Sequence, residues 1–481
     1  MLARLLTMSD LFYYSSIGQI LYTLFVLTMA RLKRRCAHNN VYTGCSPAAE
    51  EAGFLQPPIE KRLAAATPPG RRTAEKMATH PDEMQNEWSF PAPLVLPNDD
   101  LALDPKYPPQ SLKSWLTYNR KMPIKLPRNK IYVVQPPEVT SSVKAMMDGW
   151  ETPRVPKEFA TPDLPAGITS PSTDDLCNYL RSFYHKMVVE KHEGKFRWQA
   201  WGSGSKKNPK YIGLATPKPS EELIGVRFRP APDGIARMQV NLNDVLDALI
   251  DRVPPDAYAI VMLTDLDIYE DEDDDFCCGR AYGESRIAVV SSFRYNPKLD
   301  VYSDIQLGHM WPTSHCESYV DELCGADKHQ CKRAKVSSSL PDSPLVAAIA
   351  ACNVVPIPKT RDELAGMWFS RVARTMAHEL GHCLGLDHCV YYACAMQGSA
   401  GMAEDMRQPP YLCPVCLSKI SWALCSFVGP GVFVNLQRDY IEQRYNALRT
   451  FCENWKHVGM FAGYQAWIDG RIEEKKKNPW D

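Results

Sequence analysis

The sequence predicts an α/β or α+β domain that follows a long proline-rich part. Apolar runs of strand length occur at 131–134, 257–264 and 285–295, and they are mixed with segments whose apolar residues recur at helical spacing. A long helix is expected from about Asp362 to Leu384. Strands mixed with helices in this way form a sheet packed against helices. Many of the 39 prolines lie before residue 220, which predicts extended, loop-rich chain there.

Composition places the chain among globular proteins and excludes one class of partner. Apolar residues make up 45% and charged residues 23% of the 481 residues, and the formal net charge is -1. So little net charge gives no electrostatic basis for binding nucleic acid, and no such partner is expected. The 16 cysteines are clustered rather than evenly spaced, which favours metal binding over a disulfide scaffold. We expect a monomer.

Residues 1–37 are interpreted as an N-terminal leader or membrane anchor. Residues 11–30 carry no charged side chain, and this run has about the length of a bilayer-spanning helix. Basic residues follow from Arg31. Ser15 and Gln19 dilute the apolar character, so an unanchored leader stays equally open. If the segment spans a membrane, the basic residues predict that the rest of the chain faces the cytoplasm. Both interpretations place the main body in a reducing compartment.

Composition divides the remainder of the chain into four parts. Residues 38–87 are polar and lack a sustained period, so a mobile, disordered linker is expected. Residues 88–127 alternate prolines with short apolar runs, which suits an extended segment packing on the surface of a later domain. The main domain is expected over 128–460 with an insertion at 301–361, and residues 461–481 form a C-terminal tail.

Local signals define further elements of this domain. A helix is expected after Ser172, which can cap it, because acidic residues fill its first turn and apolar residues share one face. A shorter helix at 241–253 leads into the buried strand at 257–264. Six consecutive acids, Glu270–Asp275, repel one another and predict a solvated loop before the next strand.

The stretch "HELGHCLGLDHC" carries the pattern H-E-x-x-H-x-x-G-x-x-H. His378 and His382 are four residues apart and share one helix face, and Glu379 follows the first of them. A continued helix would place His388 about 15 Å along the axis from His378, too far to share a zinc ion that binds nitrogen at about 2.0–2.1 Å. Gly385 stands where the helix must break, because glycine readily takes the left-handed conformation that ends helices. The pattern therefore predicts that His388 turns back as a third ligand.

Three neutral imidazoles leave the fourth position of zinc open, as in catalytic rather than structural sites. A water in that position has a lowered pKa, and the metal polarises a peptide carbonyl. Glu379 would act as general base, taking the proton of the zinc-bound water and delivering it to the leaving amine. Peptide-bond hydrolysis is the reaction that this pattern predicts. A helix that is merely rich in polar residues is the competing interpretation.

Four cysteines form a second cluster in the same part of the sequence. Cys413 and Cys416 form a C-x-x-C at the start of a helix, which can present two thiolates to one ion. Cys389 and Cys394, five apart, can supply two more and close a four-sulfur zinc site. Two disulfides or buried free thiols are the alternatives, and a reducing compartment disfavours the disulfides. Because successive side chains of an extended chain point to opposite faces, adjacent His388 and Cys389 can serve different metals.

The residues after the third histidine resemble those of one family. In "HCVYYACAM", followed by "CPVC", a cysteine comes directly after the third histidine and before C-x-M and C-x-x-C, which is similar to the archaemetzincin family of metzincin zinc metallopeptidases. The resemblance extends from about Ile131 to Cys416. It implies catalytic zinc on the three histidines, Glu379 as general base and structural zinc on the four cysteines. It also implies that Met396 is the methionine of the turn beneath the metal.

The resemblance further implies a metzincin-like zincin domain with a twisted mixed sheet, a backing helix, an active-site helix and a small zinc-stabilised C-terminal subdomain. Metzincins hold substrate antiparallel to an edge strand, for which 276–282 is the candidate. The acidic loop after Tyr269, the insertion and the N-terminal extension depart from the family pattern. Because of these departures, the resemblance does not predict how a substrate reaches the site.

We therefore expect a zinc metallopeptidase with two zinc ions per chain and a peptide or protein substrate. Aminopeptidase and endopeptidase action both stay open, because side-chain pockets are not local in sequence. The rival hypothesis is a zinc-stabilised, catalytically inactive peptide- or protein-binding module. Glu379 argues against it, since a metal needed only for folding has no use for a carboxylate beside its first ligand.

Overall fold

The computed structural model divides the chain into two units, Met1–Asn39 and Asn40–Asp481. It describes residues 38 and 40–481 with these exceptions: 68–86, 118–122, 162, 203–209, 218–220, 326–342, 426–429 and 478–481. The apolar segment 11–30 lies outside the described residues. Among the residues that are described, no helix combines the length and apolar character needed to cross a membrane.

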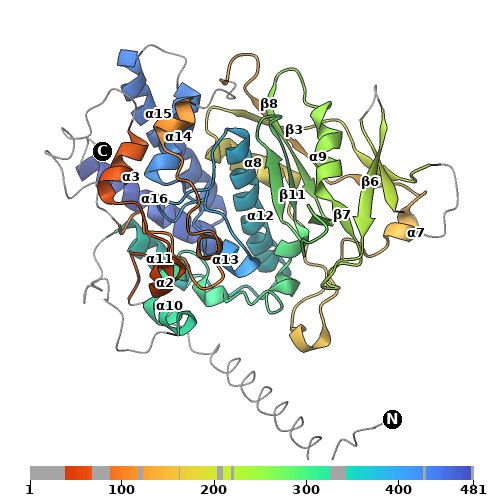
Figure 1. Ribbon diagram of the computed structural model, residues 1–481, viewed down its shortest axis with the longest axis horizontal. Helices are drawn as coiled ribbons and strands as arrows, with labels where there is room; N and C mark the ends of the chain where they lie inside the picture. The colour runs from red at the N-terminus through yellow and green to blue at the C-terminus, as the bar shows by residue number, and fades with distance from the viewer. Residues whose placement is uncertain are drawn as a thin grey trace, which may run out of the picture. The chain divides into compact units, whose positions relative to one another are not determined.

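A five-stranded sheet forms the centre of the second unit (Figure 1). Its strand order is β10-β11-β8-β1-β3, and every pairing is parallel except that of β10 with β11. The strands are β1 (Lys130–Val134), β3 (Val188–Lys191), β8 (Ala257–Thr264), β10 (Gly279–Tyr282) and β11 (Ile287–Ser291). The predicted strands at 131–134 and 257–264 are confirmed. The one expected at 285–295 ends earlier, because a 3-10 helix, η3 (Phe293–Tyr295), follows β11 directly.

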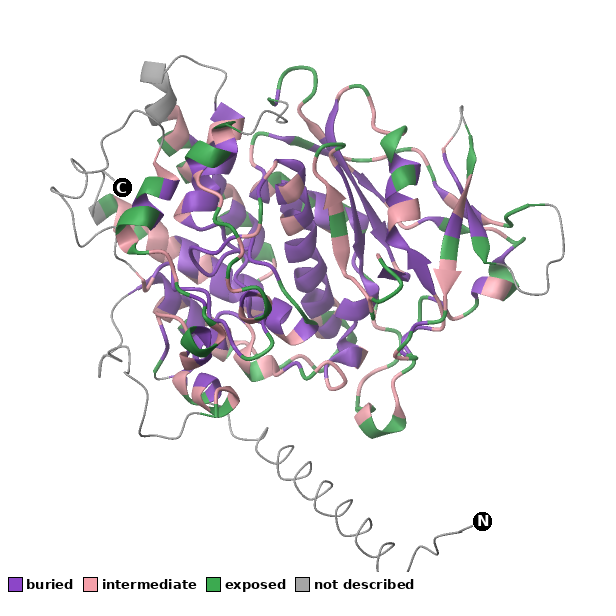
Figure 2. Ribbon diagram, in the orientation of Figure 1, coloured by how far each residue is buried: buried purple, intermediate pink, exposed green. Residues whose placement is uncertain are grey.

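Both faces of the central sheet are covered, which explains why β8 and β11 are buried along their whole length (Figure 2). Alternate residues of β8 point to opposite sides. Ala259, Val261 and Leu263 belong to the core that contains α8 (Thr173–Phe183) and α12 (Arg361–Cys383). Ile260 and Met262 belong to the core that contains α9 (Leu242–Ile250). The predicted backing helix is α8, and Ser172 caps it by accepting a hydrogen bond from the Asp174 N–H.

A second, six-stranded sheet covers the α9 side and was not predicted. Its order is β2-β4-β5-β6-β7-β9, and its strands are β2 (Glu138–Val139), β4 (Arg197–Gln199), β5 (Tyr211–Ala215), β6 (Leu223–Arg229), β7 (Gln239–Asn241) and β9 (Asp267–Tyr269). Ile212, Leu214 and Val226 of this sheet share a core with α9. Most of these strands are too short to show a clear alternation of apolar residues. The proline-rich composition therefore concealed regular structure before residue 220.

Two predictions about the ends of the described unit were wrong. The expected linker 38–87 contains α2 (Pro47–Ala52) and α3 (Ile59–Ala66), and Phe54 and Leu63 of this region are buried. Only the part at 68–86 lies outside the described residues. The expected tail 461–481 belongs largely to α16 (Gly459–Lys477), a helix that packs against α11, α12 and α15. In both places a few apolar residues at the right spacing outweigh the polar composition, because they find a partner surface elsewhere in the chain.

The remaining described helices lie both around α12 and in other parts of the second unit. Within the predicted insertion 301–361 lie η5 (Leu307–His309), η6 (Thr313–His315), α10 (Glu317–Leu323) and α11 (Pro344–Val354). The others are α5 (Asp100–Leu103), α6 (Leu112–Thr117), α7 (Lys144–Met147), η2 (Lys157–Phe159), η4 (Pro297–Leu299), α13 (Met402–Arg407), α14 (Pro414–Cys425) and α15 (Pro430–Asn454). Helix α12 is buried over most of its 23 residues, because it has the sheet on one side and helices α8 and α16 on others.

Helix α12 begins and is held by defined polar contacts. Thr360 and Glu363 form a capping box at its start. The Thr360 side chain accepts a hydrogen bond from the Glu363 N–H, and the Glu363 side chain accepts one from the Thr360 N–H. In its middle, the Arg371 guanidinium donates to both carboxylate oxygens of Asp300, at 2.6 and 3.0 Å, and to the Tyr295 carbonyl at 3.1 Å. These contacts tie the middle of α12 to the chain that follows β11.

Replacing Asp300 with Ala should leave the Arg371 guanidinium, which is 2% exposed, buried without its carboxylate. We expect a loss of about 3–5 kcal/mol in the free energy of unfolding, measured by urea denaturation. Glu453→Ala is the control, because it removes one partner of the exposed pair with Lys456 and should leave the unfolding midpoint unchanged. Equal midpoints for the two variants would contradict this view of Arg371.

Candidate active site and metal centres

The helix that carries the first two histidines ends in a Schellman motif. Helix α12 stops at Cys383, and Gly385 takes the left-handed conformation with φ +76°. The Gly385 N–H donates to the His382 carbonyl at 2.8 Å, and the Leu386 N–H donates to the Gly381 carbonyl at 3.1 Å. Helix α12 thus ends two residues before Gly385, which has a positive φ. This motif reverses the chain within three residues and returns it toward the helix face that bears the histidines.

The turn brings the three predicted histidines together. One ring nitrogen from each of His378, His382 and His388 lies within 4.8 Å of the others, and the ring centroids are 4.7–5.3 Å apart. The His378 Nδ1 contacts the Ala395 carbonyl at 2.7 Å, and the His382 Nδ1 contacts the Leu386 carbonyl at 2.6 Å. Because a carbonyl can only accept, both Nδ1 atoms must carry the proton. Both Nε2 atoms are then bare acceptors.

These two bare nitrogens face each other at 3.0 Å. Two lone pairs at that distance repel unless a cation lies beside them, and in a tetrahedral zinc site neighbouring nitrogens are roughly 3.3 Å apart. Burial keeps the rings neutral: it lowers the pKa of His382 to about 4, with a further contribution from His388. Neutral imidazoles with free Nε2 atoms are the donors that zinc prefers. The residues present therefore fit the metal that the sequence predicted.

Glu379 lies between α12 and the edge strand β10. Its side chain is buried, and a Cβ built on Gly279 of β10 would lie 3.1 Å from the Glu379 Oε1 and Cγ atoms. Burial raises the pKa of Glu379 to about 8, while the positive charge of Arg280 opposes the shift. The glycine leaves room for the carboxylate beside the strand. A proton acceptor is thus held one residue from the first histidine, facing the same cleft.

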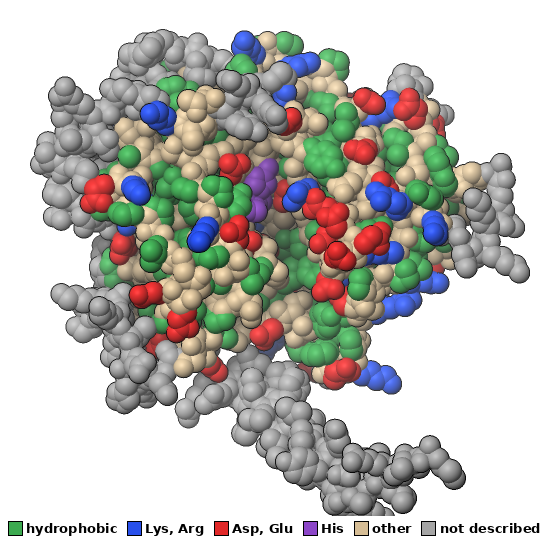
Figure 3. Space-filling view, viewed as in Figure 1, with side chains coloured by type: hydrophobic (Ala, Val, Ile, Leu, Met, Phe, Trp, Pro, Cys, Tyr) green, Lys and Arg blue, Asp and Glu red, His purple; other side chains and the backbone are tan. Residues whose placement is uncertain are grey.

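A cleft of about 900 Å³ opens over these residues. Figure 3 shows histidine side chains at the bottom of a hollow, with acidic side chains along one rim. Strand β10, the end of α12 and the loop at 397–402 line the cleft, and residues 273–275 of the acidic loop contribute to its rim. Tyr107 and Gln110 also line it. Sequence reasoning missed these two, because no local pattern connects them to the histidines.

The loop after His388 passes under α12. A Cβ on Gly381 of the helix would collide with the Met396 thioether, so the methionine packs directly against the helix backbone between the two helical histidines. The Met396 carbonyl accepts a hydrogen bond from the Cys389 N–H at 2.7 Å. Met396 is 1% exposed. Met396 thus packs against α12 at Gly381, next to His382.

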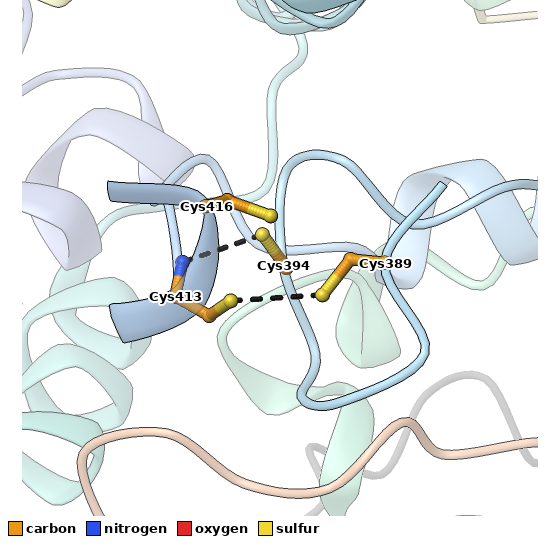
Figure 4. Close-up of side chains that lie close together, drawn as sticks. All are labelled: Cys389, Cys394, Cys413 and Cys416. Carbon is orange, nitrogen blue, oxygen red and sulfur yellow. Dashed lines mark hydrogen bonds between the residues drawn. The ribbon is translucent and has the colours of Figure 1, made fainter. Parts of the chain in front are cut away.

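The four predicted cysteines converge below this loop (Figure 4). Their sulfur atoms lie within 4.8 Å of one another, and all four residues are buried free thiols. The Cys389 and Cys413 Sγ atoms are 3.6 Å apart, close to the roughly 3.8 Å between sulfurs of a tetrahedral zinc site. The Cys394 Sγ accepts hydrogen bonds from the N–H groups of Met396 at 3.4 Å and Cys413 at 3.3 Å. Such donors stabilise thiolates that bind a metal. Cys383 is buried within α12.

These residues define the class of the protein. It carries a candidate metal site built on H-E-x-x-H-x-x-G-x-x-H, together with an adjoining four-cysteine cluster. Residues 349–422 match the model of peptidase family M54. Archaemetzincin-2 of Macaca fascicularis is 31% identical over 187 residues, which is 39% of this chain and 42% of that protein. Archaemetzincin-1 of Mus musculus is 26% identical over 216 residues, or 44% of this chain and 36% of that protein.

Two solved structures also align with the chain. One is archaemetzincin from Methanopyrus kandleri, with 16% identity, a TM-score of 0.30, and coverage of 62% of this chain and 97% of that one. The other is a zinc-dependent peptidase from Methanocorpusculum labreanum, with 17% identity, a TM-score of 0.28, and coverage of 60% and 99%. The chain spans less than half the length of the curated relatives it matches. The family match at residues 349–422 and these relatives show that the part of the chain around the candidate metal site is similar to archaemetzincins.

The conformation of Gly385 can be tested by a pair of substitutions. Gly385→Ala puts a Cβ on a left-handed residue, which costs about 1–2 kcal/mol, whereas Asn tolerates this conformation better. We expect Gly385→Ala to lower both the free energy of unfolding and the affinity of the histidine site for zinc. Gly385→Asn should retain most of both. Urea denaturation and chelator competition measure the two quantities, and equal losses in both variants would contradict the helix-ending role.

Proposed function

We propose that the protein is a zinc-dependent metallopeptidase of the metzincin type. One observation carries the proposal: the His378 and His382 Nε2 atoms face each other at 3.0 Å at the bottom of a cleft that also contains buried Glu379. The arrangement offers three neutral nitrogen ligands from one side, which leaves room for water and substrate on the other. The family match over 349–422 supports the same function.

When bound, zinc supplies a Lewis acid that polarises the scissile carbonyl and lowers the pKa of the attacking water. Glu379 would accept the proton of that water and pass it to the leaving amine as general base and then general acid. Burial raises the pKa of Glu379, and shifted pKa values are common among residues that exchange protons in active sites. His378 and His382 are kept in one tautomer by backbone carbonyls, so their Nε2 atoms stay available.

Strand β10 is the proposed platform for the substrate backbone. It is one of the two edge strands of the central sheet, and its residues Gly279, Arg280 and Ala281 line the cleft that contains Glu379. An extended peptide can add to such an edge through main-chain hydrogen bonds. We propose a metzincin layout for the domain. In it, the central sheet lies on one side of the cleft, and the loop after His388 with the helices that follow it lies on the other. Aminopeptidase and endopeptidase action are both compatible with the open cleft.

We also propose a second, structural zinc on Cys389, Cys394, Cys413 and Cys416. Four thiolates complete a tetrahedral shell and leave no open position, so this ion would serve folding rather than chemistry. Residues 388 and 389 are adjacent, and the Cys389 N–H is bonded to Met396 beneath the helix. The second ion would therefore hold the loop at 388–396, which packs against the helix that carries His378 and His382.

Replacing Glu379 with Gln tests the chemistry. We expect cleavage of a peptide library, followed by mass spectrometry, to fall about 10²–10⁴-fold, with zinc content unchanged, because the proton acceptor is lost and the ligands remain. Asp362→Asn is a matched control, since it removes an exposed carboxylate at the other end of the same helix. If Glu379→Gln cleaves as well as the wild type, the proposed mechanism is wrong. If the wild type binds zinc and cleaves nothing, the chain is a binding module instead.

Replacing Cys413 with Ala tests the structural ion. We expect the zinc content, measured by elemental analysis, to fall from two ions to one per chain and the thermal midpoint to drop, because three sulfurs no longer close the shell. Cys425→Ala is the control: this thiol is also buried on α14 but stands outside the four-cysteine cluster. Two zinc ions in the Cys413→Ala protein would exclude the four-sulfur site.

A further inference from the structure

A segment far from the zinc motif in sequence lies across the turn that ends α12. Within it, Gln110 hydrogen-bonds to both ends of the turn. Its Nε2 donates to the Gly385 carbonyl at 3.1 Å and to the Asp387 carboxylate at 2.8 Å, and its Oε1 accepts from the Asp387 N–H at 3.1 Å. Lys419 of α14 donates to the same Oε1 at 2.7 Å. The Gln110 side chain thus bonds both a backbone carbonyl and a backbone N–H of the turn.

The same segment satisfies a further carbonyl at the helix end. The Trp115 Nε1 donates to the Leu384 carbonyl at 3.2 Å, and Trp115 is 4% exposed. Together with Gln110, it binds three positions just before His388. Carbonyls at a helix C-terminus lack intrahelical partners. The segment supplies partners, and it does so from 88–117, outside the predicted domain boundary at 128.

The segment also surrounds the ring of the third histidine. The Tyr107 ring lies 5.7 Å from the His388 ring, centroid to centroid. The Asp100 carboxylate and the His388 Nδ1 face the same small space beside Gly398: a Cβ there would touch the Asp100 Oδ2 and lie 2.8 Å from Nδ1. Asp100 is held in turn by Glu404, whose carboxylate accepts from the Asp100 N–H at 2.9 Å. No side chain at residue 398 separates the two groups.

This environment distinguishes the third histidine from the first two. His378 and His382 lie on a buried helix, and backbone carbonyls orient them. His388 follows a two-residue link from a left-handed glycine, where the backbone alone restrains it less. Residues that orient a metal-binding histidine through its second nitrogen commonly affect metal affinity.

We propose that the N-terminal segment positions the third ligand of the histidine site, with Gln110 fixing the turn at 385–387 and Asp100 orienting the His388 ring. Both are positioning residues, since they act on the ligand His388 and its turn rather than on the metal. The inference rests on the proposed zinc site but not on peptide cleavage. It predicts a defect in metal binding that is confined to the histidine site and leaves the four-cysteine site intact.

The test measures metal affinity in the full-length protein. The dissociation constant of the histidine site for zinc is obtained by chelator competition for the wild type, Gln110→Ala and Asp100→Ala. We expect each variant to bind about 10–100-fold more weakly, the range found when outer groups around a metal site are removed. Lys113→Ala is the matched control, because Lys113 is exposed on the same segment, and it should bind as the wild type does.

Cobalt substitution separates the two sites. Only thiolate ligands give a sulfur-to-cobalt charge-transfer band, so that band reports the cysteine site and should be unchanged in both variants. If Gln110→Ala does not fold, Trp115→Phe, which removes one N–H, and Asp100→Asn carry the same measurement. Affinities within about threefold of the wild type in the variants that fold would overturn the proposal, since outer groups around a metal site normally matter more than that. A wild type that binds zinc at the histidines without cleaving peptides would overturn the proposed function and leave this inference standing.

Discussion

The constraint on which the site depends is the place where α12 ends. A helix that continued past Cys383 would carry His388 about 15 Å from His378. The left-handed Gly385 and the two reversed hydrogen bonds to Gly381 and His382 turn the chain back instead. The same turn directs the Leu386 carbonyl at the His382 Nδ1. One backbone conformation therefore both delivers the third histidine and fixes the tautomer of the second.

The loop between His388 and Met396 connects the histidine cluster to the four-cysteine cluster. It is closed by the hydrogen bond from the Cys389 N–H to the Met396 carbonyl, and its Ala395 carbonyl orients His378. Two residues of this loop contribute sulfurs to the lower cluster. Gly381 lets the Met396 side chain approach the helix closely. A displacement of the cysteine cluster would thus be transmitted to His378 through a few bonded residues.

The sequence predicted what depends on short-range geometry. The histidines, Glu379, Gly385 and the four cysteines are connected by one helix turn, one break and one C-x-x-C, so their spacing carries the information. The second sheet was not predicted, since its short strands are stabilised by pairing with distant chain and show little pattern of their own. Tyr107 and Gln110 could not be found either: Gln110 contacts Gly385 across 275 positions. A polar side chain that completes a distant turn looks in sequence like any exposed glutamine.

The N-terminal segment is itself anchored before it reaches the site. The Ser89 carbonyl accepts from the Trp467 Nε1 of α16 at 3.0 Å, and the Pro91 carbonyl accepts from the Ala393 N–H at 2.9 Å. Asp99 pairs with buried Arg407 of α13. Because each anchor lies on a different element, the segment has little freedom left when it arrives at Asp100 and Gln110. The surroundings of the histidine cluster therefore include chain well before residue 128, and that chain is itself held by α13 and α16.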